Sequence, residues 1–153
     1  MRQGQIDAAA SILMFCIVVL ATTNAQAAPK AVTFESRAAV TEWIENYRHK
    51  PDPARMPVAV RALSKMLALR DPEAAGFYVG FVAGVLGRNP KQAERLIDKM
   101  LPLPSSDDWL VVRAVAYSGL PEWKDLLRKI APKLPARHVM IGEYLAGKLP
   151  PLA

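Results

Sequence analysis

The feature that most constrains the fold of this chain is a series of helix-start signals that recur at regular intervals. Ser36, Asp71 and Ser105 each carry a short polar side chain that can accept a hydrogen bond from the first free amides of a helix. Pro72 follows Asp71, and proline is tolerated at a first helical position because its missing N–H has no partner there. Ser105 followed by Asp108 predicts a capping box. The three starts lie about 35 residues apart, which leaves room for two helices in each interval.

Apolar residues between these signals recur every three or four positions, which is the period of a helix with one buried face. Asn89-Pro90 provides a further capped start, and Gly87, Gly119 and Gly147 stand where left-handed C-terminal stops are expected. The pattern predicts six to seven short helices and no strand pair. The predicted helices span about residues 36–49, 54–69, 72–87, 90–101, 105–118, 121–131 and 136–147.

We therefore expect an all-α domain of short antiparallel helices over residues 28–153, arranged as an array of helical hairpins or as an irregular bundle. The spacing of about 35 residues resembles that of tetratricopeptide and related helical-hairpin repeats. The resemblance is limited to spacing, because the large and small residues of the tetratricopeptide signature do not occur at their fixed offsets. No specific family is indicated.

The first 27 residues have the three parts of a secretory signal peptide. A polar head with one arginine precedes an apolar, uncharged stretch at 8–21, and Ala25-Gln26-Ala27 offers the small residues that a signal peptidase recognises. The apolar stretch is short for a spanning helix, which needs about 20 residues. We expect cleavage before Ala28, no stable transmembrane span after it, and a periplasmic or secreted protein. An uncleaved membrane anchor and a buried core helix are the alternatives.

The segment from Ala74 to Gly87 has no charged residue, and Gly76, Gly80 and Gly84 recur along it at every fourth position. Spaced in this way, the glycines share one face of a helix. Each costs about 1 kcal/mol of helix stability relative to alanine. We expect close packing of a neighbouring helix to compensate, so that Gly80→Leu would overpack and destabilise the domain. Membrane insertion and pairing with a second chain are the alternatives.

No thiol or histidine site stands out in the sequence. The one cysteine, Cys16, lies inside the predicted signal peptide, so the mature chain has no disulfide or thiolate. His49 and His138 show no paired spacing, and a zinc site needs three or four converging ligands. We interpret both as surface residues and predict no metal, cofactor or catalytic residue.

Two carboxylate pairs have ordinary structural interpretations. Asp107-Asp108 lies at a predicted helix start, where negative charge is favoured by the helix dipole. Glu94 and Asp98 share a predicted helix with basic residues one turn away, as on a salt-bridged solvent face. The two carboxylates of a glycosidase can be far apart in sequence, so an envelope enzyme that acts on glycans through dispersed carboxylates is the alternative function.

The binding residues that we predict are Trp109, Arg113 and Tyr117, which form one stripe on a helix whose other positions are mostly apolar. An arginine between two aromatic residues can stack on both, a contact worth about 0.5–1 kcal/mol when exposed. In one interpretation Arg113 also pairs with a carboxylate of a neighbouring helix and stabilises the fold. In the other, the stripe is a flat aromatic–cationic platform for sugar rings or an anionic peptide.

The formal net charge of +6 favours anionic partners, and basic side chains are dense in the last thirty residues. Nucleic acid is not expected as the partner of an exported protein, and no aromatic–basic interleaving supports it. The sequence thus predicts an exported interaction module, in keeping with a bacterial periplasm, that binds an unknown protein or an anionic envelope component. A structural subunit that joins a larger complex through the glycine-rich helix is a further alternative.

Overall fold

The computed structural model describes residues 33–151, so the predicted signal peptide and the predicted cleavage before Ala28 lie outside it. The described residues form seven α-helices and no strand, which confirms the predicted all-α class. None of these helices is both long enough and apolar enough to cross a membrane. The helices are α1 (Arg37–Asn46), α2 (Met56–Lys65), α3 (Pro72–Arg88), α4 (Ala93–Met100), α5 (Trp109–Ala116), α6 (Trp123–Ile130) and α7 (His138–Leu145).

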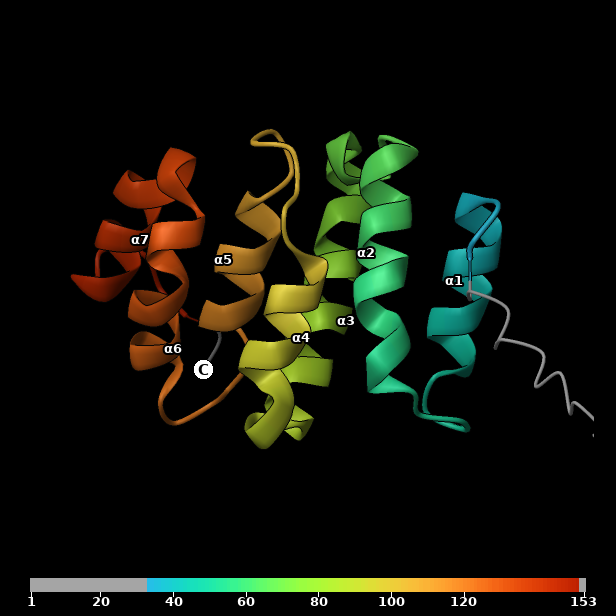
Figure 1. Ribbon diagram of the computed structural model, residues 1–153, viewed down its shortest axis with the longest axis horizontal. Coiled ribbons are helices and arrows are strands. Elements are labelled where there is room, and N and C mark those ends of the chain that lie inside the picture. Colours follow the sequence, from blue (N-terminus) through green and yellow to red (C-terminus); the bar gives the residue numbers. More distant parts are fainter. Residues whose placement is uncertain (1–32, 152–153) are drawn as a thin grey trace, which may run out of the picture. The chain divides into compact units, whose positions relative to one another are not determined.

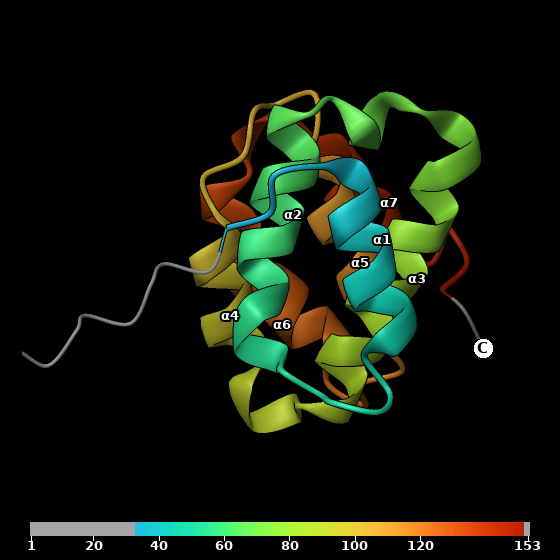
Figure 2. The same cartoon turned by 90° about the vertical axis from the view of Figure 1, so that its right-hand side faces the viewer.

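The helices follow one another as hairpins in sequence order (Figure 1). Within the hairpins, α1 packs on α2, α3 on α4 and α5 on α6. Between hairpins, α2 packs on α4, α3 on α5 and α5 on α7. Seen from the α1 end, α2 and α4 lie on one side and α3 on the other (Figure 2). Of the two predicted arrangements, the structure has the hairpin array.

Side chains of successive hairpins meet at the spacing seen in the sequence. Lys129 Nζ lies 2.6 Å from Glu94 Oε2, and Lys133 Nζ lies 2.5 Å from Asp98 Oδ1. Each pair is separated by 35 residues. The two carboxylates therefore pair with the next hairpin, and not with basic residues of their own helix as the sequence suggested.

Local signals at helix ends account for much of this architecture. The Ser36 hydroxyl accepts a hydrogen bond from the amide three residues later, and the Asp71 carboxylate accepts one from the amide two residues later. Gly119 and Gly147 have φ angles of 69° and 71°, the left-handed conformation that glycine adopts at low cost. These four caps and stops agree with the sequence prediction.

The predicted capping box at Ser105 and Asp108 is wrong. Helix α5 begins only at Trp109, and Asp108 makes no side-chain capping bond. The preceding residues form a turn in which the amides of Asp107 and Asp108 donate to the Pro104 carbonyl. The carboxylates are thereby free to point into the protein.

The boundary between α3 and α4 also differs from the prediction. Asn89 does not cap the following helix, because its side-chain amide donates to the Val85 carbonyl at 2.8 Å and closes the end of α3. Pro90 begins a short 3₁₀ turn before α4. Gly87 lies inside α3, and is not the left-handed stop that was expected.

The close packing expected at the glycine face of α3 is not found. Gly76, Gly80 and Gly84 are exposed, and a Cβ placed on any of them would meet no atom within 4 Å. Tyr78, Val82 and Leu86 take the buried face of α3, so the glycines are turned outward, and Phe77 is 47% exposed as well. The close neighbour on which the predicted overpacking by Gly80→Leu depended is therefore absent at the Cβ position. The close backbone contact lies instead at Gly87, where a Cβ would overlap the carbonyl oxygen of Ser118.

Candidate functional site

Helix α5 presents a narrow polar and aromatic stripe to solvent. Six of its eight residues are buried, because the helix packs against α3, α6 and α7. Arg113 is exposed, and Trp109 is half-buried, as is Tyr117 at the end of the helix. These are the three residues that the sequence singled out on this helix.

The stripe forms one side of a groove with a volume of about 740 Å³. Gly76 and Gly80 of α3 lie on the groove as well, whereas Gly84 does not. Since neither glycine has a side chain, the α3 side of the groove is open down to the helix backbone. The aromatic–cationic stripe of α5 and two of the three glycines of α3, which the sequence marked separately, thus line the same groove.

Arg113 stacks on only one of its two aromatic neighbours. Its guanidinium carbon lies 5.3 Å from the centroid of the Trp109 ring. Among residues 33–151, no carboxylate lies within ion-pair distance of Arg113. The stack is therefore as predicted on the Trp109 side, but the stabilising ion pair of the first interpretation is not found in the described chain.

Tyr117 is held by α7. Its ring packs edge-on against Tyr144 with centroids 6.3 Å apart, and the two hydroxyl oxygens are 3.5 Å apart. Burial raises the pKa of Tyr144 to about 12, and its hydrogen bond to Tyr117 acts in the same direction. This pair fixes the wall of the groove beside Arg113.

Two further arginines, Arg70 and Arg137, lie on the groove, and no pattern in the sequence marks them as binding residues. Arg137 is already hydrogen-bonded within the protein, since it donates to the buried Asp108 carboxylate and to the Ser105 carbonyl. Arg70 is more loosely held. Its Nε is 4.0 Å from Asp107 Oδ1, and 56% of its side chain is exposed.

The aspartates behind these arginines lie directly before α5, as the sequence suggested, but they are buried and hydrogen-bonded to distant segments. Asp107 and Asp108 are 0% and 5% exposed. The buried Ser64 hydroxyl donates to Asp107 at 2.5 Å. The neighbouring Ser106 hydroxyl also donates to Asp107, but the Arg137 and Ser64 partners are 29 and 43 residues away from their aspartates, so no local sequence signal marks the pair as buried.

The groove is strongly one-sided in charge. It is lined by three arginines and by no aspartate or glutamate. The side chains of Arg and Trp donate hydrogen bonds and accept none. Such a surface suits a ligand rich in acceptors and negative charge.

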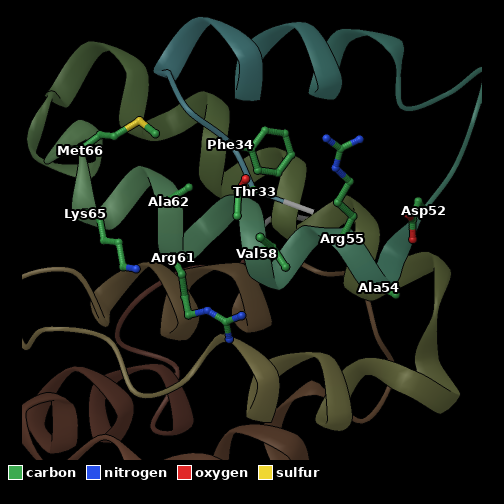
Figure 3. Close-up of a pocket in the computed structure, with 10 residues that line it drawn as sticks. All are labelled: Thr33, Phe34, Asp52, Ala54, Arg55, Val58, Arg61, Ala62, Lys65 and Met66. Carbon is green, nitrogen blue, oxygen red and sulfur yellow. The ribbon is translucent and has the colours of Figure 1, made fainter. Parts of the chain in front are cut away.

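A second hollow of about 610 Å³ lies along α2 (Figure 3). Its cationic groups do not converge, because Arg55 points to Phe34 while Arg61 and Lys65 point away from that ring (Figure 3). The Arg55 guanidinium carbon is 4.4 Å from the Phe34 centroid, and Arg61 donates to the Lys99 carbonyl. Both arginines act within the fold, so this hollow is the weaker candidate.

Four of the six basic residues in the last thirty positions are held in ion pairs. Arg128 pairs with Asp125 in its own helix at 2.5 Å, and Lys129, Lys133 and Arg137 pair with carboxylates of other segments. These pairs agree with ordinary solvated helix faces.

His49 and His138 are exposed, and within residues 33–151 no three His, Cys, Asp or Glu side chains come together as a metal site.

The groove between α3, α5 and α7 is therefore the strongest candidate site. No family model, curated protein or solved structure matches this chain, so the case for function depends on the groove itself.

Proposed function

We propose that this protein is an exported interaction module of the bacterial envelope, periplasmic or secreted, which binds a partner in the groove between α3, α5 and α7. The observation that carries the proposal is the convergence on one groove of an exposed arginine–tryptophan stack and an open glycine wall. The predicted signal peptide at residues 1–27 supports export.

Binding accounts for this groove better than catalysis on glycans. A glycosidase places two carboxylates on either side of the bond that it cleaves, about 5–10 Å apart. No carboxylate lines the groove. Elsewhere, Glu94 and Asp98 are paired with lysines, and Asp107 and Asp108 are buried behind the groove.

Site-specific crosslinking in cells tests the proposal. The full chain is expressed in a bacterium with a photoreactive phenylalanine analogue in place of Ser106, which is exposed and lines the groove without being part of the glycine wall. The control carries it in place of Gly142 of α7, which is exposed as well but does not line the groove. We expect a discrete adduct from position 106 alone, and the same adducts from both positions would refute a groove-specific partner.

The role of Arg113 is tested by Arg113→Ala on the same background. Because this side chain is exposed and makes no ion pair in the described chain, its removal costs only the stack on Trp109, about 0.5–1 kcal/mol, so we expect a melting temperature at most a few degrees lower and complete loss of the adduct. A variant that is destabilised and loses the adduct only in proportion would mean that Arg113 acts in the fold.

Export is tested by mass spectrometry of the protein recovered from the envelope. We expect a mature N-terminus at Ala28. An intact residue 1, or a lipid on Cys16, would contradict the predicted processing.

A further inference from the structure

We propose that the ligand of this groove is an acidic segment of a partner protein, whose carboxylates bind Arg113 and Arg70 while its main chain lies against the glycine wall. This inference rests on the proposed function, and it adds the chemistry of the partner.

The charges favour carboxylates. Of the three arginines, Arg137 is already bound to Asp108 and the Ser105 carbonyl, which leaves Arg113 and the loosely held Arg70 to receive a ligand. A guanidinium group presents a planar fork that matches a carboxylate with two parallel hydrogen bonds.

The shape and the hydrogen-bonding groups favour a polypeptide over a neutral glycan. Gly76 and Gly80 let another main chain approach closely, because no side chain stands in the way. Sugar hydroxyls need acceptors as well as donors. The groove lining has no carboxylate, amide or imidazole side chain, and the hydroxyls of Ser106 and Tyr117 are its side-chain oxygens.

Apolar surface completes the site. Val79, Met140 and the Trp109 ring lie on the same groove as the arginines. An acidic segment with an apolar side chain between its carboxylates would cover this surface and reach both arginines. A purely acidic polymer would leave it exposed.

The probe is a fluorescein-labelled peptide of four Glu-Ala-Leu repeats, titrated into the exported protein by fluorescence anisotropy at several salt concentrations. Matched peptides carry Gln or Lys in place of Glu. We expect the Gln peptide to bind at least about tenfold more weakly, the Lys peptide not to bind, and the affinity for the Glu peptide to fall as salt rises.

Variants locate the binding. Gly80→Leu places a side chain in the groove, and its Cβ meets no atom within 4 Å, so it should remove binding while the protein melts no lower than the wild type. Gly142→Leu, on α7 and outside the groove, should bind as the wild type does. Arg113→Gln should weaken binding of the Glu peptide about tenfold and leave the weak binding of the Gln peptide unchanged.

Three results would overturn the inference: equal affinity for the Glu and Gln peptides, full binding by Gly80→Leu, or groove-dependent binding of tripolyphosphate or anionic vesicles in place of the peptide. If position 106 crosslinks a partner and the acidic peptide does not bind, only the proposed chemistry fails. If neither occurs, the proposed function fails as well.

Discussion

Two glycines of α3 should respond in opposite directions to the same substitution. Gly80 is exposed, and a Cβ there would meet nothing within 4 Å. Gly80→Ala should therefore stabilise the protein by about 1 kcal/mol, the usual difference in helix propensity. A Cβ at Gly87 would overlap the carbonyl oxygen of Ser118 and lie 3.3 Å from its carbonyl carbon.

The clash at Gly87 involves backbone atoms, which cannot rotate away as a flexible side chain can. Overpacking of this kind costs about 1–3 kcal/mol, and the propensity gain offsets about 1 kcal/mol of it. With the cost near its upper end, Gly87→Ala should be destabilised by about 1–2 kcal/mol. The two variants should then differ by about 2–3 kcal/mol, or roughly 10 °C in melting temperature for a domain of this size.

Urea denaturation followed by far-UV circular dichroism measures this difference, with Gly84→Ala as a second exposed control. Equal stability of Gly80→Ala and Gly87→Ala would refute the assignment of the close contact. A destabilised Gly80→Ala would instead restore the packed glycine face that the sequence suggested.

Three further predictions concern buried, strained and titrating residues. Asp107→Ala removes the buried acceptor of Ser64 and should lower the free energy of unfolding by about 2–4 kcal/mol. Asp125→Ala breaks an exposed ion pair and should change that free energy by less than about 0.5 kcal/mol, so similar losses for the two variants in urea denaturation would contradict the prediction. Leu67 has a φ of 57°, so Leu67→Gly should be about 1 kcal/mol more stable than Leu67→Ala, and the opposite order would exclude backbone strain there. The pKa of Tyr144 is raised from its ordinary 10.0 to about 12, so the folded protein keeps this proton at a pH where the unfolded chain loses it. Stability measured from pH 10 to 12 should therefore fall, and fall less steeply in Tyr144→Phe; identical slopes would contradict the raised pKa.

The helices were predictable because their signals are local. Ser36, Asp71 and Gly119 act on backbone groups within a few residues, and these caps and stops lie where the sequence placed them. The exposure of the glycine face of α3 could not be predicted from such local signals. Periodicity showed that the glycines share one side of α3, but which side is buried depends on how much apolar surface the opposite face brings to the core.

The candidate site was only half visible in the sequence. Trp109, Arg113 and Tyr117 could be found because they are the exceptions on an otherwise apolar helix. Arg70 and Arg137 lie outside the α-helices, where no period singles them out, and their buried partners come from distant segments.

The glycines of α3 also give an argument for function that does not depend on the arginines. Each costs about 1 kcal/mol of helix stability, and at Gly76, Gly80 and Gly84 no packing contact compensates that cost. Sites that bind a partner often carry such uncompensated costs. Only Gly76 and Gly80 line the groove, so only these two should matter for binding. We expect Gly76→Leu to remove crosslinking from position 106 and acidic-peptide binding, and Gly84→Leu to preserve both while stabilising the helix to a similar degree. Equal loss in the two variants would mean that the partner covers the whole glycine face of α3 and is not confined to the groove.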